Sequence, residues 1–199
     1  MNNIIVLDLE TQKSFKEVGK AKLEKLRVSV AGIYDYQTGQ FAIYEERELM
    51  QLEKRLQDID LIIGFNIRRF DLPVLAPYLF MPVEGLPVLD LLEDVEKFRG
   101  HRASLESLAA PTLKQHKSGS GADALTLFKE NRLEELKRYC LDDVRLTKEI
   151  YEYGCAHGKI RFMSNRDYQV HEVPVSWGGA LTELKAQKKA EDPFPTSLF

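Results

Sequence analysis

The sequence predicts an α/β fold in which a mixed β-sheet is flanked by helices. Two observations support this class: three consecutive strand patterns begin the chain, and helical patterns then alternate with short buried strands. With 199 residues, 44% of them hydrophobic, the chain can form one domain with a real core. We expect this domain to span residues 1–177, and the charged, Pro-rich segment 185–199 to be a weakly ordered tail.

The elements follow from hydrophobic spacing and from turn residues. Strands are predicted at 4–9, 28–36, 40–44, 60–64 and 87–90, with a late hairpin at 160–175. Helices are predicted at 46–56, 70–80, 122–129 and 133–153, with another after residue 90 and one that starts after Ser104. Pro73 falls in the first turn of its helix, where proline is tolerated. Ser107, rather than Glu, follows Ser104 by three residues, so we expect an N-cap without a capping box.

Charge and cysteine usage exclude several classes of protein. A formal net charge of −3 and a pI near 5.9 provide no global basic field, so contacts with nucleic acid must be local or metal-bridged. Cys140 and Cys155 have no zinc-binding or redox spacing, which argues against a disulfide framework. The N-terminus lacks a basic leader, and no apolar stretch approaches 18 residues. We therefore expect a cytoplasmic protein with no membrane partner.

Two carboxylates end the first predicted strand. Residues i and i+2 of a strand point to the same face, so Asp8 and Glu10 project together. A bound cation would remove their mutual repulsion, and ligands that offer only oxygen select hard ions such as Mg²⁺ or Mn²⁺. The alternative is a strand that leaves the core and becomes polar at its end.

A second polar segment follows the buried strand at 60–64. It begins with Asn66 and ends with Asp71, at the carboxyl end of the strand, where α/β sheets tend to bind ligands. Asp71 is therefore a candidate ligand, although capping of the next helix would explain it equally well. Arg68 and Arg69 add two cations suited to phosphate. A solvated loop is the alternative for both arginines, and we favour it for at least one.

The third segment lies on the long predicted helix. Tyr139 and Asp143 are four residues apart, so they share a face about one turn apart. A phenol and a carboxylate in this arrangement could hold a metal and orient its water. Asp142 points about 100° away and is not expected to be a ligand. The alternative is a surface helix on which the two aspartates pair with Lys148 or Arg138.

Taken together, the three segments resemble the exonuclease motifs of the DEDD superfamily, specifically its tyrosine subclass. This subclass includes the proofreading exonuclease domains of family B DNA polymerases. The matches are Asp-x-Glu at 8–10, Asn-x-x-x-Phe-Asp at 66–71 and Tyr-x-x-x-Asp at 139–143. The histidine subclass would need His at the position of Arg138. The resemblance covers roughly residues 1–153 and extends to free-standing bacterial exonuclease domains, in which a segment like Lys117-Ser118-Gly119 precedes the third motif. It implies an RNase H-like fold.

The resemblance also implies a mechanism and a set of site residues. The protein would act as a 3′-5′ exonuclease on single-stranded nucleic acid with a 3′ end, and each site would bind two Mg²⁺ or Mn²⁺ ions. The metal ligands would be Asp8, Glu10, Asp71 and Asp143, and Tyr139 would orient the attacking water. The substrate-binding residues would be Asn66, Phe70, Arg68, Arg69 and Lys117.

A second function stays open from the sequence. The chain could be a catalytically silent nucleic-acid-binding accessory module of a separate polymerase or helicase. The presence of all four carboxylates and of the tyrosine argues against this alternative. The motifs do not choose between DNA and RNA, because that choice depends on contacts to the 2′ position. The segment 160–199 lies outside them and receives no role.

Overall fold

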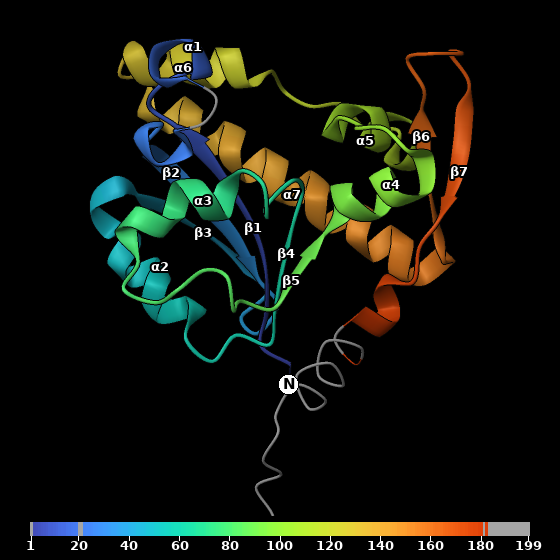
Figure 1. Cartoon of the computed structure of the whole chain (residues 1–199), viewed down its shortest axis with the longest axis horizontal. Coiled ribbons are helices and arrows are strands. Elements are labelled where there is room, and N and C mark those ends of the chain that lie inside the picture. Colours follow the sequence, from blue (N-terminus) through green and yellow to red (C-terminus); the bar gives the residue numbers. More distant parts are fainter. Residues whose placement is uncertain (1, 20–21, 181, 183–199) are drawn as a thin grey trace, which may run out of the picture.

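A computed structural model describes residues 2–19, 22–180 and 182 (Figure 1). Its centre is a five-stranded sheet in the order β3-β2-β1-β4-β5. The strands are β1 (Ile4–Thr11), β2 (Val28–Asp35), β3 (Gln40–Glu45), β4 (Leu61–Gly64) and β5 (Val88–Asp90). The first three strands pair antiparallel, whereas β4 and β5 run parallel to β1. The mixed sheet predicted from the sequence is confirmed, while the tail at 185–199 lies outside the described residues.

Helices cover both faces of the sheet (Figure 1). The α-helices are α1 (Phe15–Val18), α2 (Leu49–Leu56), α3 (Asp71–Leu75), α4 (Leu91–Arg99), α5 (Leu105–Leu113), α6 (Gly121–Lys129) and α7 (Leu133–His157). Short 3₁₀ turns are η1 (Leu23–Lys25), η2 (Glu46–Glu48), η3 (Ala76–Tyr78) and η4 (Trp177–Gly179). One core lies between the sheet and α2 and α3, and a second lies between the sheet and α4, α5 and α7. None of the helices among the described residues has the length and apolar character that a membrane span requires.

Alternation along β1 separates its core residues from its acids. Leu7 and Leu9 are buried in the core on the side of α2 and α3. Asp8 and Glu10 share the opposite face with Val6, which packs into the core that contains α7. This face of β1 therefore changes from apolar to acidic as the strand reaches its C-terminal end.

Gly32 allows α7 to lie close to the acidic end of β1. It is paired with Asp8 across the β1–β2 ladder. A Cβ at this position would lie 3.1 Å from both Cys140 Sγ and Val144 Cγ2, tighter than ordinary packing. The Cys140 thiol lies 3.6 Å from the backbone oxygen of Asp8. The missing side chain thus places the turn of α7 that carries Asp143 beside β1.

Two local expectations need correction. The helix predicted over 70–80 is shorter, because α3 ends at Leu75 and only the 3₁₀ turn η3 follows, ending at Tyr78. Pro77 has no N–H with which to extend an α-helix. At the start of α5 a capping box is present, since Ser107 replaces the usual Glu: its Oγ accepts from the Ser104 N–H at 3.0 Å, and Ser104 Oγ accepts from the Ser107 N–H at 3.1 Å.

The late segment forms a separate two-stranded antiparallel sheet, with strands β6 (Lys159–Met163) and β7 (Val170–Pro174). The Thr112 hydroxyl of α5 ties β6 down, because it donates to the Arg161 carbonyl at 2.8 Å and accepts from the Arg161 N–H at 2.9 Å. After β7, the Trp177 indole donates to Asp94 Oδ2 at 3.0 Å. The middle of β6 is therefore fixed to α5, and the segment after β7 is fixed to α4.

Candidate active site

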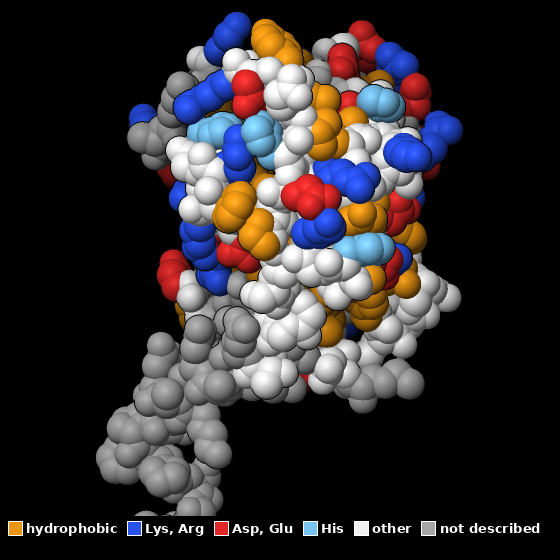
Figure 2. Space-filling model, turned by 90° about the vertical axis from the view of Figure 1, so that its right-hand side faces the viewer, with side chains coloured by type: hydrophobic (Ala, Val, Ile, Leu, Met, Phe, Trp, Pro, Cys, Tyr) orange, Lys and Arg blue, Asp and Glu red, His pale blue; other side chains and the backbone are white. Residues whose placement is uncertain are grey.

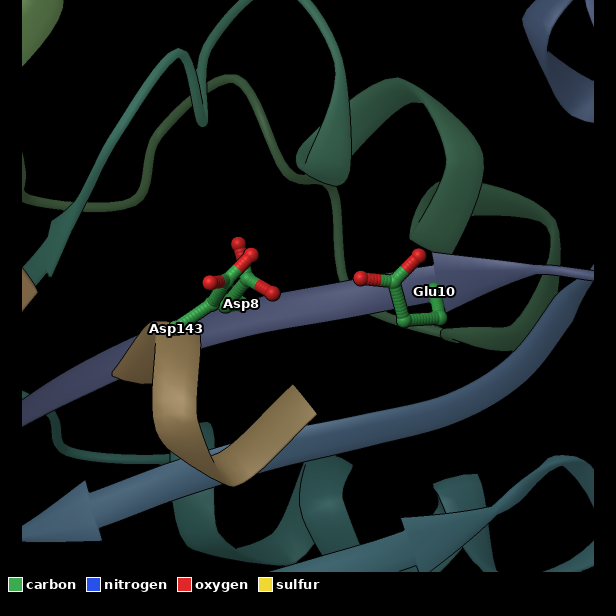
Figure 3. A group of neighbouring side chains, drawn as sticks. All are labelled: Asp8, Glu10 and Asp143. Atoms are coloured by element: carbon green, nitrogen blue, oxygen red, sulfur yellow. The ribbon is translucent and has the colours of Figure 1, made fainter. Parts of the chain in front are cut away.

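Three carboxylates from two elements gather at a cavity of about 430 Å³. Asp8 and Glu10 project from β1 and Asp143 from α7, with the carboxylates of Asp8 and Asp143 side by side (Figure 3). One oxygen from each lies within 4.8 Å of the others. Asp8 Oδ2 and Asp143 Oδ1 are buried and accept no hydrogen bond from the described residues. Buried carboxylate oxygens without a donor are costly unless a cation or proton satisfies them.

Burial, together with the crowding of like charges, makes these carboxylates hard to ionise. Burial raises the pKa of Asp8 well above its ordinary value, and the charges of Asp71, Asp143 and Glu10 raise it further. Burial, together with the charge of Asp143, raises the pKa of Glu10 to about 8. Burial also raises the pKa of Asp143, although Lys117 opposes that effect. The cluster therefore has a strong electrostatic demand for positive charge.

Lys117 supplies one positive charge to this cluster. Its Nζ lies 2.6 Å from Asp143 Oδ2, with only 21% of the side chain exposed. Burial by itself would lower the pKa of Lys117, but the charges of Asp143, Asp8 and Glu10 raise it above its ordinary range. Lys117 is therefore charged and faces the cavity, which it lines. One lysine cannot neutralise all the carboxylates around it.

Asp71 belongs to the same cavity but is held differently. Its side chain is 3% exposed, and its Oδ1 accepts from the Leu9 N–H at 3.1 Å, which connects the start of α3 to β1. Burial raises the pKa of Asp71 to about 8, despite the hydrogen bond from Leu9 that favours the charged form. Asp71 is the first residue of α3, not its N-cap, which is Phe70. It lies near enough to raise the pKa of Asp8, yet it is not one of the three mutually close carboxylates.

Tyr139 lies one helical turn before Asp143 and lines the same cavity. Burial raises the pKa of Tyr139 far above its ordinary value, and the charges of Asp143 and Glu10 add to the effect. The Lys117 ammonium lies 5.5 Å from the centre of the tyrosine ring. The phenol therefore stays protonated, so that it can donate a hydrogen bond but cannot act as a base at neutral pH. Asp142 faces elsewhere and pairs with Arg145 at 2.6 Å.

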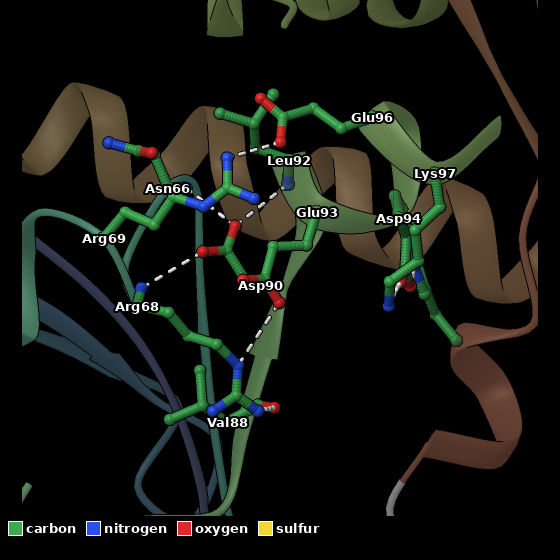
Figure 4. A network of polar contacts seen from close by, with 11 residues as sticks. Asn66, Arg68, Arg69, Val88, Asp90, Leu92, Glu93, Asp94, Glu96 and Lys97 are labelled. Carbon is green, nitrogen blue, oxygen red and sulfur yellow. Dashed lines mark hydrogen bonds and ion pairs between the residues drawn. The ribbon is translucent and has the colours of Figure 1, made fainter. Parts of the chain in front are cut away.

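Asp90 organises the loop that carries the second motif (Figure 4). Its Oδ1 accepts from the Asn66 N–H at 2.8 Å and the Leu92 N–H at 3.1 Å, and its Oδ2 accepts from the Arg68 N–H at 3.1 Å. These bonds hold Asn66 in the left-handed region, with φ at 66°, a conformation that Asn tolerates better than most residues. Asp90 was not among the site residues predicted from the sequence. Its place at the end of a predicted strand, before a helix, was the available signal.

Arg68 and Arg69 are turned away from the acidic cavity, whose lining residues do not include them. The Arg68 guanidinium donates to the Val88 carbonyl and lies 3.4 Å from Glu93, while Arg69 pairs with Glu96 at 2.6 Å (Figure 4). Asn66, Phe70 and Lys117 do line the cavity. Of the five residues predicted to bind substrate, the structure therefore gathers three at the acidic cluster.

The cavity also has an aromatic wall and a further arginine. The Phe15 and Phe70 ring centres are 5.9 Å apart with the rings tilted, and Phe15 is 41% exposed. Arg102 lines the cavity, hydrogen-bonds the Asn66 side chain and lies 3.4 Å from Glu96. Arg102 was not predicted as a site residue, because no local pattern places it beside Asn66.

The residues present suit a hard divalent cation. All the candidate ligands are carboxylates, the ligand atoms of Asp8, Glu10 and Asp143 already converge, and two of the buried oxygens have no other partner among the described residues. Oxygen-only donor sets favour Mg²⁺ or Mn²⁺ over softer metals. A cation at this position would also relieve the repulsion that raises the pKa values of the cluster.

Comparison with known families agrees with this geometry. The model of the RNase_H superfamily matches residues 6–155, a range that contains all three acidic motifs and the entire five-stranded sheet except its first two residues. A search of the curated proteins found no match. Because the matched range is well over half of the chain, we conclude that this protein belongs to the RNase H superfamily.

Proposed function

We propose that this protein is a metal-dependent 3′-5′ exonuclease that hydrolyses the terminal phosphodiester bond of single-stranded nucleic acid. Membership in the RNase H superfamily indicates a nuclease or another nucleic-acid-related activity. The observation that carries the finer proposal is the convergence of Asp8, Glu10 and Asp143, with buried oxygens free to bind a cation. The Tyr-x-x-x-Asp spacing on α7 supports an exonuclease of the tyrosine subclass over other members of the superfamily.

In this proposal Asp8, Glu10 and Asp143 hold one divalent cation, and Asp8 and Asp71 contribute to a second. When bound, these cations supply Lewis-acid chemistry, which activates a water and stabilises the charge that develops on the phosphate and leaving group. The hydrogen bond from the Leu9 N–H fixes one oxygen of Asp71 at the edge of the cavity. Because β1 and α7 both carry ligands of the first cation, the distance between these two elements would be critical for activity.

The remaining side chains position the reactants. Tyr139 stays protonated and donates a hydrogen bond that orients the attacking water. Lys117, already at the mouth of the cluster, donates to a non-bridging oxygen of the scissile phosphate. Phe15 and Phe70 present ring faces on which the terminal base can stack. Asn66, held by Asp90 and Arg102, contacts the terminal nucleotide.

The test is degradation of 3′- and 5′-labelled single-stranded DNA and RNA with Mg²⁺ or Mn²⁺. The variants Asp8→Asn and Asp143→Asn keep side-chain shape and remove one ligand charge each. The matched control is Asp142→Asn, because Asp142 is the neighbouring aspartate and pairs with Arg145 outside the cluster. Stepwise shortening from the 3′ end, lost in both ligand variants and kept in the control, would support the proposal. Retained binding without turnover in any metal would instead identify an accessory binding module.

A further inference from the structure

A second cavity, of about 290 Å³, adjoins the acidic one. Arg102, Ala103 and Ser104 line both cavities, so the segment 102–104 is their shared wall. The other walls of this second cavity come from α5, from β6 and from the turn that follows β6. We call it the arginine pocket and define it by its lining residues, which are His101, Arg102, Ala103, Ser104, Ser107, Phe162, Asn165 and Arg166.

The lining of the arginine pocket is chemically one-sided. It contains two guanidinium groups, an imidazole, an amide and two hydroxyls, and no carboxylate. The two guanidinium groups, the Asn165 amide and the Ser104 hydroxyl can donate hydrogen bonds to an oxyanion. The Ser107 hydroxyl already donates to the Ser104 carbonyl at 2.7 Å, and His101 Nδ1 lies 3.0 Å from the Arg99 carbonyl. The whole chain has a net charge of −3, so a cavity without acids is a local exception. The charge and donor set fit a phosphate group and do not fit a cation.

Arg166 is the most available charge in the pocket. Its guanidinium has no ion pair or hydrogen bond with any described residue, although its backbone N–H donates to Ser164 Oγ at 3.2 Å. The adjacent carboxylate of Asp167 is directed to His171, at 2.9 Å. By contrast, Arg102 already contacts Glu96 and Asn66. Arg166 therefore offers an unused positive charge to a ligand.

Burial and backbone hydrogen bonds fix the turn that carries Arg166. Ser164 is 1% exposed, its N–H donates to the Gln169 carbonyl at 3.0 Å, and its own carbonyl accepts from the Tyr168 N–H at 3.0 Å. The same turn exposes 80% of Tyr168, a ring face on which a base can stack. Figure 2 looks onto the side of the molecule that carries β6 and β7, and shows Lys and Arg side chains interspersed with hydrophobic, His and Asp or Glu side chains. A positive charge beside an exposed aromatic ring, as at Arg166 and Tyr168, is typical of surfaces that bind single strands.

We propose that the arginine pocket binds a backbone phosphate of the same single strand whose 3′ end enters the acidic cavity. The strand would cross the segment 102–104 and reach the turn between β6 and β7. This inference rests on the proposed function and deepens it, because it assigns a second contact to the substrate. The hairpin lies beyond residue 155, where the superfamily match ends, so Phe162, Asn165 and Arg166 complete the pocket from outside the matched range.

The test compares binding of strands of two lengths. Fluorescence anisotropy would follow a labelled trinucleotide, which fills only the acidic cavity, and a labelled dodecanucleotide, with the full chain in Mg²⁺ and an Asp8→Asn background that prevents degradation. Arg166→Glu should weaken dodecanucleotide binding about tenfold and lower the slope of log Kd against log salt by about one. Trinucleotide binding should change less than about twofold.

The control variant is Arg47→Glu, since Arg47 is an exposed arginine on η2, among the N-terminal elements, and pairs only with Glu45 at 3.2 Å among the described residues. Equal affinities of Arg166→Glu and its parent for the dodecanucleotide would overturn the proposal, as would equal losses for both strand lengths. Hydrolysis by the wild-type protein is measured in parallel. A length-dependent binding loss without hydrolysis would keep the arginine pocket and reject the nuclease. Hydrolysis by the wild type together with unchanged affinity in Arg166→Glu would keep the nuclease and reject the arginine pocket as a binding site.

Discussion

Replacing Glu10 by glutamine should stabilise the metal-free protein while removing a ligand that the metal-bound protein needs. Burial and the charge of Asp143 raise the pKa of Glu10 to about 8 from an ordinary value of 4.5. A carboxyl group with a raised pKa in the folded state costs stability once the unfolded chain can ionise. Glutamine has nearly the same shape and never ionises, so the variant avoids this cost.

The size of the effect follows from the pKa and changes with pH. One pKa unit corresponds to about 1.4 kcal/mol, so the rise from 4.5 to about 8 amounts to about 5 kcal/mol when the group is fully ionised. Glu10 is partly exposed, and solvent screening lowers our expectation to about 3 kcal/mol at pH 8. Below pH 4.5 both states are protonated and the penalty is absent. Wild-type stability in EDTA should therefore fall as the pH rises from about 4.5 to 8, and that of Glu10→Gln should fall less.

The assay is urea unfolding of both proteins in EDTA and in Mn²⁺ at several pH values across this range. In EDTA at pH 8 the variant should be the more stable protein. In Mn²⁺ the order should reverse, because a cation that binds only the folded state stabilises it, and the wild type keeps the ligand. Glu24→Gln is the control, since Glu24 is an exposed glutamate on η1. The reasoning would be refuted if Mn²⁺ left the stability of the wild type unchanged and if Glu10→Gln were no more stable than the wild type in EDTA.

Three further predictions concern single contacts. Lys117→Met removes the partner of buried Asp143 and should cost about 3 kcal/mol in EDTA, less in Mg²⁺, by urea unfolding; equal losses in both buffers would contradict a role for Lys117 as counter-charge. Tyr139→Phe removes only a hydroxyl, so in the degradation assay kcat should fall by a larger factor than KM changes, and Tm should stay the same. A change in KM alone would assign Tyr139 to substrate binding. Gly154→Ala places a Cβ 2.3 Å from the Trp177 ring and should destabilise the protein by about 2 kcal/mol in thermal unfolding, whereas an unchanged Tm would mean that Trp177 is not held against α7.

Much of the fold could be predicted because its signals are local. The spacing of apolar residues in β1, β2 and α7 reports which face of each element is buried, and the five strands of the main sheet start within one residue of their predicted positions. The helix after Asp71 was predicted too long, because its apolar spacing continues past Pro77, where the backbone cannot donate the next bond. The capping box at Ser104 was missed because a serine fills the position that Glu usually occupies.

The candidate site was predictable in part for a related reason. The alternation of a strand puts Asp8 and Glu10 on one face, and helical spacing puts Tyr139 and Asp143 on another. The contacts of Arg68 with Val88 and Glu93, and the use of Asp90 to hold the second motif, join residues about 20 positions or more apart in the chain. No local pattern encodes such pairs.

Sequence periodicity was thus sufficient for the elements, for the motifs and for the side of each element on which an acid projects, because these depend on neighbours one to four residues away. Packing across the sheet decided the rest. Gly32 lets α7 approach β1, and only this approach brings Asp143 into the range of Asp8 and Glu10 and buries their charges together. The packed core sets the distances between segments that are far apart in the chain. These distances determine the raised pKa values, the position of Lys117 and the arginine pocket beside the acidic cavity.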